Sequence, residues 1–196
     1  HSFPYHEVLG SESLSYLYFW TCNVSFKRNF MLHAGMFDER FLFYEDVICG
    51  HQMHSHGMKL HFVPLARGQH LHEMKPSGVA AKGRFYGTWL YEMFLAYPNP
   101  EIMRRFEIVS ARFGPRLLIQ SYLRRIRFRM IDNPITRMCL RAIGATSGRR
   151  SRVSDFYYNY ELRRNIFAGY SARARSNARG IQREAVPAGG KAKSGG

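Results

Sequence analysis

The chain has 196 residues, of which 45% are hydrophobic and 15% aromatic, enough to bury the core of one domain with an extension. Its three cysteines, Cys22, Cys49 and Cys139, form no Cys-x-x-Cys pair, which argues against a disulfide framework or a zinc knuckle and favours a reducing, cytoplasmic compartment. No apolar run reaches the roughly 18 residues of a transmembrane helix. Because the first residue is His1 rather than Met, we expect a fragment of a longer protein.

The charge is placed very unevenly along the chain. Residues 1–100 contain 8 Lys+Arg and 8 Asp+Glu and are neutral, so residues 101–196 hold the other 29 − 8 = 21 basic and 14 − 8 = 6 acidic residues, and with them the whole net charge of +15. All nine histidines lie in the first part, between His1 and His72. Two segments with different roles are therefore expected.

The first hundred residues predict short strands that alternate with helices. We expect a strand over residues 19–25, a helical turn over 26–33 that ends at Gly35, and a helix that opens at Glu45 and closes at Gly57. Residues 59–63 alternate like a strand, and residues 67–72 form a second extended piece. Residues 78–97 predict a helix with an aromatic face, which ends at Pro98-Asn99-Pro100.

The second part predicts helices only. Apolar residues recur at steps of three and four after residue 117, the run breaks at Asp132-Asn133-Pro134, and a further helix covers about 154–172. After Arg173 the composition of Ala, Gly, Ser, Arg and Lys predicts a disordered tail, 173–196.

One stretch carries a family resemblance. Tyr18 to Asp46 reads YFWTCNVSFKRNFMLHAGMFDERFLFYED, in which a TCNVS turn, an arginine, a GMFDE turn and a Glu-Asp pair follow in order. This order resembles the C-terminal half of the catalytic domain of family-2 inverting glycosyltransferases, including its galactosyltransferase-C-terminal-like region. The resemblance implies an α/β fold, the acceptor-side half of a GT-A domain over residues 1–100, followed by a basic helical extension over 101–172.

The same resemblance implies that part of the site lies elsewhere. In the family, a nucleotide-binding half with a DxD motif precedes this segment, and residues 1–196 contain no DxD. We therefore expect the nucleotide site upstream of His1, and we expect this chain alone to be inactive.

The Glu45-Asp46 pair is the best candidate for catalysis. Inverting sugar transfer needs a carboxylate that takes the proton of the acceptor hydroxyl, and a helix N-terminus favours an ionised carboxylate. Asp46 falls on the family's base position, and the resemblance implies that Glu45 binds or orients the acceptor. The alternative is an acidic pair that only complements the helix dipole.

Four residues of the polar turn are predicted to bind sugar. The resemblance places Trp20, Thr21, Cys22 and Asn23 in the donor- and acceptor-sugar pocket, with Trp20 as a flat apolar face and Asn23 as a fixed amide. The family usually has small residues at the first three positions, which leaves the acceptor open. The alternative is a buried strand with Trp20 in the core and Asn23 capping a turn.

A divalent cation is also implied. In the family, a histidine after the catalytic helix helps to hold Mn²⁺ or Mg²⁺, which neutralises the leaving diphosphate, and His70 lies near the matching place, with His72 as the alternative. A surface histidine pair without a ligand role is the simpler interpretation. His51, His54, His56, His33 and His61 are interpreted as surface or packing residues.

The arginine-rich helices admit three interpretations. An apolar stripe flanked by arginines over residues 112–152 fits an anionic membrane surface first, a packing appendage second and nucleic acid third, since no nucleic-acid-binding signature appears. The sequence thus predicts a glycosyltransferase that uses a nucleotide-sugar donor and a glycan or lipid-linked acceptor. A non-enzymatic module that binds anionic lipid or polymer, and a metal-dependent hydrolase built on the histidine pair, are the alternatives.

Overall fold

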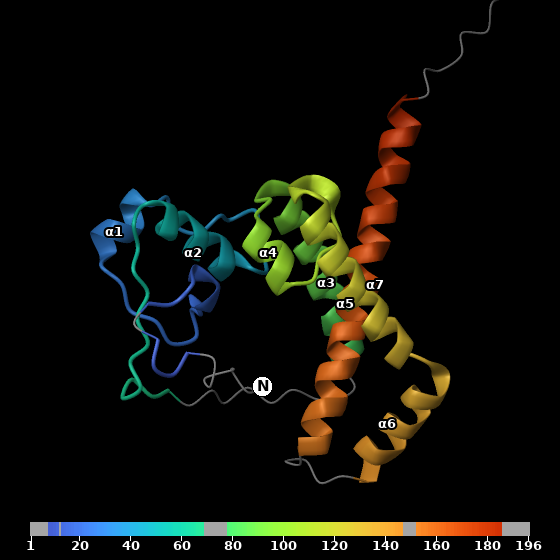
Figure 1. Ribbon diagram of the computed structural model, residues 1–196. Coiled ribbons are helices and arrows are strands. Elements are labelled where there is room, and N and C mark those ends of the chain that lie inside the picture. Colours follow the sequence, from blue (N-terminus) through green and yellow to red (C-terminus); the bar gives the residue numbers. More distant parts are fainter. Residues whose placement is uncertain (1–7, 12, 69–77, 147–151, 186–196) are drawn as a thin grey trace, which may run out of the picture.

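The computed structural model describes residues 8–11, 13–68, 78–146 and 152–185. It consists of the helices η2 (Tyr16–Tyr18), α1 (Arg28–His33), α2 (Glu45–Ser55), α3 (Val79–Ala96), α4 (Pro100–Arg105), η4 (Ala111–Phe113), α5 (Pro115–Ile131), α6 (Pro134–Thr146) and α7 (Arg152–Ala185). Helices α1 and α2 and their connecting loops form one side of the molecule, and α3, α5 and α7 pack together on the other (Figure 1).

The predicted α/β fold is wrong. About 66% of the structure is helical, and the described residues contain no strand or sheet. Their β-pairing is one antiparallel bridge, in which the Leu14 N–H donates to the Leu60 carbonyl at 2.8 Å. The structure is therefore all-helical in class.

The strand predicted at residues 19–25 is a turn because local hydrogen bonds take its backbone groups. Ser15 caps η2 by accepting from the Leu17 N–H at 3.3 Å, and the Asn23 N–H donates to the Trp20 carbonyl at 3.3 Å. Phe19 then inserts into the core, where it lies against Gly50 of α2. The apolar residues that predicted a strand thus belong to a turn, from which Phe19 packs into the core.

The helix ends in this part were predicted correctly. Gly35 follows α1 with φ 100°, Gly57 follows α2 with φ 89°, and both positions favour glycine because other residues are strained there. After each glycine the next N–H returns to the helix, from Met36 to the Met31 carbonyl at 3.2 Å and from Met58 to the Met53 carbonyl at 3.0 Å. Each helix thus ends at its glycine, and these hydrogen bonds provide donors for carbonyl groups of the last turn.

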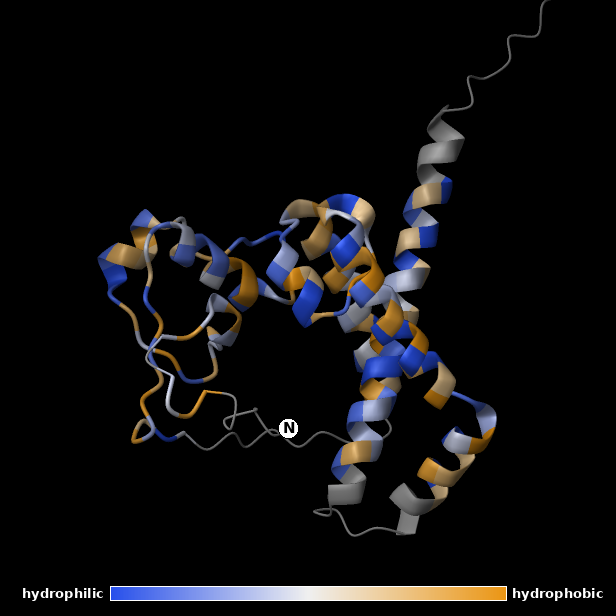
Figure 2. Ribbon diagram, viewed as in Figure 1, coloured by the Kyte–Doolittle hydropathy of each residue, from blue (hydrophilic) through white to orange (hydrophobic). Residues whose placement is uncertain are grey.

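Two clusters of buried side chains hold this part together. The smaller joins α1 to α2 through Phe19, Met31, Ala34, Cys49 and Met53. The larger packs α2 against α3 and α4, and its members are Tyr16, Phe41, Val47, Ile48, Leu90, Met93, Phe94, Ile102, Met103 and Ile108. Figure 2 shows apolar segments along the ribbons of α3 and α4, and buried residues of both helices belong to this cluster.

Helices α3 and α7 run parallel in backbone contact. A Cβ added at Gly87 would lie 2.1 Å from the Ile166 carbonyl oxygen, and one at Gly169 would lie 2.1 Å from the Arg84 carbonyl oxygen. Only glycine permits this approach. Further along, the Asn177 amide donates to the Tyr91 hydroxyl at 3.0 Å.

The helices of the second part confirm the periodicity, with one difference. The break at Asp132-Asn133-Pro134 separates α5 from α6, as predicted. Helix α7 continues to Ala185, whereas the composition predicts disorder after Arg173. The continuation has a physical basis, because Arg173 pairs with Glu92 of α3 and the alanines and arginines that follow favour helix. Its last turns project beyond the other helices (Figure 1).

Candidate active site

Asp46 lies in the first turn of α2, as the sequence predicts. The residue before the helix, Tyr44, has a left-handed backbone with φ 62° and ψ 14° and provides no side-chain cap. This sharp turn sends the Tyr44 ring into the interior, 5.2 Å from the ring of Phe106, and leaves Asp46 half-buried at the helix start. The Val47 N–H donates to Asp46 Oδ1 at 2.8 Å and fixes the carboxylate.

Burial sets the protonation behaviour of Asp46. Loss of solvation raises the pKa of its carboxyl to about 6, the hydrogen bond from Val47 opposes the shift, and the neighbouring charge of Glu45 adds to it. The sequence predicts that the helix N-terminus keeps this carboxylate ionised, but desolvation outweighs that effect. A carboxylate with this pKa is mostly ionised at pH 7 and yet accepts a proton far more readily than a free aspartate.

The structure brings Cys22 of the polar turn near Asp46. Partial loss of solvation raises the pKa of the Cys22 thiol, backbone N–H groups of the turn oppose the shift, and the negative charge of Asp46 adds to it. Thr21, Cys22 and Asn23 are exposed, so this turn lies on the surface beside α2 rather than on a buried strand.

The other turn residues have identifiable contacts. The half-buried Trp20 ring lies edge-on to Tyr18 with 5.4 Å between ring centroids, so it is neither in the core nor fully free. The Asn23 amide donates to the Ala66 carbonyl at 2.9 Å and ties the turn to the loop over residues 63–68.

The predicted metal ligand His70 and its alternative, His72, lie outside the described residues. Within the described ranges, no group of three or more histidine, cysteine, aspartate or glutamate side chains is arranged to hold a metal ion. The expectation of Mn²⁺ or Mg²⁺ therefore stays a prediction. Four of the remaining histidines have ring contacts, with His51 and His54 against Tyr16 and His33 against His56, which agrees with packing or surface roles.

The GMFDE turn has a structural role. Asp38 accepts hydrogen bonds from Arg40 Nε at 2.9 Å and from the Tyr97 hydroxyl at 2.6 Å. These bonds hold the pKa of Asp38 well below its usual range. The bond with Tyr97 joins the turn to the end of α3. It thereby anchors the segment that leads into α2.

Two polar groups near α2 were missed by sequence reasoning. The Tyr16 hydroxyl and His51 Nδ1 are buried without a hydrogen-bond partner among the described residues, although their rings lie 5.1 Å apart. Burial, followed by the nearby charge of Glu101, raises the pKa of Tyr16. No sequence signal pointed to this pair, because its two members come from separate elements.

Comparison with known proteins identifies no relative. No family model matches the chain, and no curated protein or solved structure matches it. The functional conclusions below therefore depend on the geometry of the described residues and on the resemblance drawn from the motifs.

Proposed function

We propose that Asp46 is the general base of a sugar transfer from a nucleotide-sugar donor to an acceptor hydroxyl. In this step the acceptor proton passes to the Asp46 carboxylate while the acceptor oxygen attacks the anomeric carbon. The bond from that carbon to the diphosphate breaks on the opposite face, which inverts the configuration and releases the nucleoside diphosphate. No part of this step is assigned to a metal ion.

The observation that carries the proposal is the desolvated carboxylate at the start of α2. A general base works best with a pKa near the operating pH, and burial raises that of Asp46 to about 6. An acidic residue that only complemented a helix dipole would be exposed, with a lowered pKa. The left-handed backbone of Tyr44 beside it also supports a functional role, since such strain is concentrated at functional sites.

The surroundings of Asp46 are compatible with an acceptor. The turn over residues 20–23 lies beside it and offers an indole face, a hydroxyl and an amide, the groups with which proteins bind sugars. Its exposure leaves that side open to a glycan or lipid-linked acceptor. Glu45, half-buried in the same turn of α2, is proposed to orient the acceptor hydroxyl.

The test compares matched aspartate variants in a transfer assay. The product of the complete reading frame is incubated with a panel of nucleotide sugars and Mn²⁺, and nucleoside diphosphate release is measured for wild type, Asp46→Asn and Asp155→Asn. Asp155 lies exposed in the first turn of α7, so its variant makes the same chemical change at a helix start away from Asp46. We expect Asp46→Asn to lose turnover by about 10²–10⁴-fold, and Asp155→Asn to keep it.

Retained turnover in a folded Asp46→Asn variant would remove this residue from the mechanism. Absence of turnover by the wild type with every donor would contradict the transferase itself.

A second function, association with an anionic membrane surface, is favoured by the exposed apolar residues of α5 and α6. Met130, Ile135 and Met138 are 73%, 72% and 67% exposed, an unusual state for large apolar side chains in such number. Exposed arginines on the same helices, among them Arg124 and Arg127, would meet anionic headgroups. Among the described residues, no helix has both the length and the apolar character needed to cross a bilayer.

This second function is tested by flotation of the chain with phosphatidylglycerol-containing vesicles. We expect Met130→Ser with Met138→Ser to weaken binding at physiological salt. Leu65→Ser, at an apolar residue that is even more exposed and lies away from α5 and α6, should leave it unchanged. If Leu65→Ser weakened vesicle binding as much as the two methionine changes, binding would reflect general surface hydrophobicity and not a specific face formed by α5 and α6.

A further inference from the structure

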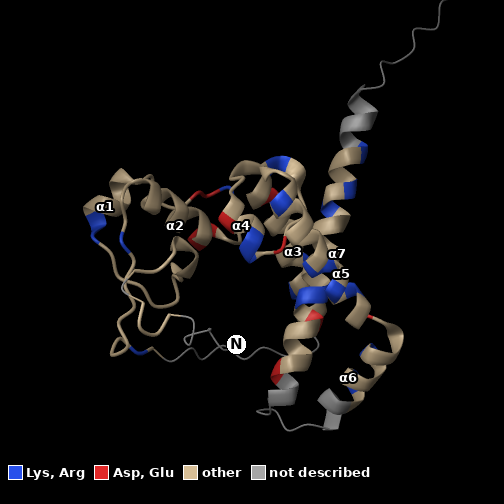
Figure 3. Ribbon diagram, in the orientation of Figure 1, with Lys and Arg blue, Asp and Glu red and all other residues tan. Residues whose placement is uncertain are grey.

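A cavity of about 590 Å³ lies where α5 crosses α7, next to the start of α6. This volume falls within the range of about 300–1,000 Å³ that is common for small-molecule sites. The residues that line it are Val109, Tyr122, Arg125, Ile126, Phe128, Arg129, Asp132, Arg137, Arg164, Phe167, Ala168, Ser171 and Arg175. Figure 3 shows the concentration of basic residues at this crossing.

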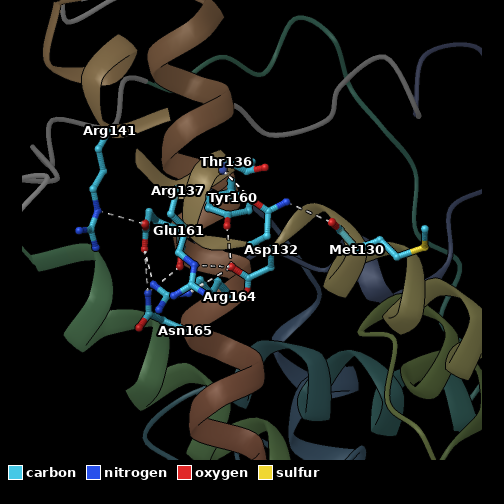
Figure 4. A network of polar contacts seen from close by, with 10 residues as sticks. Met130, Asp132, Thr136, Arg137, Arg141, Tyr160, Glu161, Arg164 and Asn165 are labelled. Atoms are coloured by element: carbon cyan, nitrogen blue, oxygen red, sulfur yellow. Dashed lines mark hydrogen bonds and ion pairs between the residues drawn. The ribbon is translucent and has the colours of Figure 1, made fainter. Parts of the chain in front are cut away.

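The charge of the lining is strongly positive. Five arginines and one carboxylate line the cavity, and that carboxylate is already engaged. Asp132 Oδ1 accepts from the Tyr160 hydroxyl at 2.6 Å, and it lies 3.1 Å from Arg137 Nε and 3.5 Å from Arg164 Nε (Figure 4). The single negative charge of Asp132 is thus shared by Arg137 and Arg164. The other three arginines of the cavity lining have no carboxylate of the lining beside them.

Those three arginines, Arg125, Arg129 and Arg175, form no ion pair with a carboxylate among the described residues. Burial, together with the like charge of Arg129, lowers the pKa of Arg125. Accumulated positive charge of this kind is unfavourable in the free protein, and an anion between the guanidinium groups would relieve it. The Nε of Arg137 is also buried, and its geometry toward Asp132 is not that of a hydrogen bond.

Two of the arginines that line the cavity, Arg125 and Arg164, are held in position by neighbouring groups. Arg125 donates to the Ser171 hydroxyl at 2.8 Å, and its guanidinium lies over the Phe167 ring, 5.0 Å from the centroid. Arg164 is held by Glu161 at 3.2 Å. Planar guanidinium groups held in this way match the oxygens of a phosphate, which they bind through paired hydrogen bonds.

The rest of the lining is apolar and defines the other half of the ligand. Val109, Ile126, Phe128, Phe167 and Ala168 contribute aliphatic and aromatic surface to the same cavity. An inorganic phosphate would leave this surface uncovered, whereas an organic group attached to the phosphate would cover it. The cavity therefore fits an amphiphilic anion.

We propose that the cavity between α5 and α7 binds an organic phosphate, with the phosphate between Arg125, Arg129 and Arg175 and the apolar group against Phe128 and Phe167. The ligand is either a soluble phosphoester or a phospholipid headgroup, which share this chemistry. The proposal is independent of the role of Asp46, which lies in α2, and of the exposed methionines of α5 and α6.

The test is isothermal titration calorimetry of the whole chain at about 150 mM salt, where diffuse charge effects are screened. One arm uses dihexanoyl phosphatidic acid below its micelle concentration, with inorganic pyrophosphate for comparison. The other arm uses phosphatidylcholine vesicles with and without phosphatidic acid. The variant Arg129→Gln/Arg175→Gln changes two exposed cavity residues. The matched control is Arg67→Gln/Arg84→Gln, which removes two exposed arginines that lie outside the cavity and outside α5 and α6.

We expect saturable 1:1 binding of the soluble phosphatidic acid, or of the phosphatidic acid vesicles alone if the source is a membrane. The cavity variant should weaken either binding by roughly tenfold or more, and Arg67→Gln/Arg84→Gln should leave it nearly unchanged. Two results would overturn the proposal: no saturable binding in either arm, or equal weakening by Arg67→Gln/Arg84→Gln, which would indicate diffuse electrostatic attraction. Circular dichroism of each variant confirms that the helices remain.

Discussion

Gly87 of α3 lies against the backbone of Ile166 in α7, so closely that a Cβ at Gly87 would come within 2.1 Å of the Ile166 carbonyl oxygen. The same Cβ would lie 2.6 Å from the Tyr170 amide nitrogen. Both obstacles are backbone atoms, which cannot move aside as a side chain can. The pairing of α3 with α7 therefore depends on the absence of a side chain at this residue.

We predict that Gly87→Ala destabilises the protein, although alanine has the higher helix propensity. The clash should cost about 2–3 kcal/mol or more in free energy of unfolding, because the helices must separate. Gly78→Ala is the control, since a Cβ there meets nothing within 4 Å and the backbone is not left-handed. Urea denaturation of both variants measures the difference, and equal midpoints would contradict the close contact.

The second prediction concerns the pH dependence of Asp46→Asn. Burial raises the pKa of the folded carboxyl from 3.8 to about 6, so its ionisation is unfavourable to the fold. The penalty is absent below about pH 4, develops between about pH 4 and pH 6, and above that amounts to about 2 kcal/mol with allowance for partial exposure. Asparagine stays neutral and still accepts from the Val47 N–H.

Asp46→Asn should therefore raise the free energy of unfolding at pH 8 and have little effect at pH 3.5. Thermal or urea unfolding across this range provides the measurement. A stability difference that does not change with pH would mean that the carboxyl is not desolvated.

Asp38 should show the opposite pH dependence. Hydrogen bonds from Arg40 and Tyr97 hold its pKa well below the usual range, so its contribution is present above about pH 4 and declines as the pH falls below that. Asp38→Asn should lose about 1–2 kcal/mol at pH 7, and the difference should narrow toward pH 2. Glu39→Gln, at the exposed neighbouring residue, is the control and should be nearly neutral. A loss that stays constant between pH 7 and pH 2 would assign the effect to packing.

The hydroxyl of Tyr160 supports the link between α5 and α7. It is part of a buried tyrosine that donates to Asp132 Oδ1 at 2.6 Å (Figure 4). Tyr160→Phe should lower the free energy of unfolding by about 1–2 kcal/mol, because Asp132 loses a charge-assisted hydrogen bond inside a partly buried network. The exposed Tyr122→Phe should be nearly neutral. Chemical denaturation distinguishes the two, and a neutral Tyr160→Phe would show that the arginines alone hold Asp132.

The sequence predicted the helices well and the strands badly. Periodic apolar residues and the stops at Gly35, Gly57 and Asp132-Asn133-Pro134 are local signals, and a helix satisfies its hydrogen bonds within one segment. A strand needs a partner, and in the described residues Leu14 and Leu60 supply a single bridge. The described parts of the segments predicted as strands therefore formed turns and irregular loops, and the α/β prediction was wrong.

The candidate sites differ in the same way. Asp46 could be located because a Glu-Asp pair at a helix start is a local pattern, although its desolvation could not be read from the sequence. The arginine-lined cavity could not be predicted, because its residues come from α5, α6 and α7 and from Val109 before η4. Their convergence depends on the crossing of these helices, for which sequence periodicity gives no angle.

The few contacts that hold α6 have a consequence for local unfolding of the protein. Arg141 of α6 forms an ion pair with Glu161 of α7, and Arg137 of α6 forms one with Asp132, the residue that follows α5. Ile135 and Met138 of α6 are largely exposed, whereas α3 and α7 are in backbone contact. Helix α6 should therefore detach in brief excursions that leave the α3–α7 pair closed. Amide hydrogen exchange would distinguish local detachment of α6 from global unfolding. The α6 amides should exchange early, while the amides near Gly87 and Gly169 should exchange only through global unfolding.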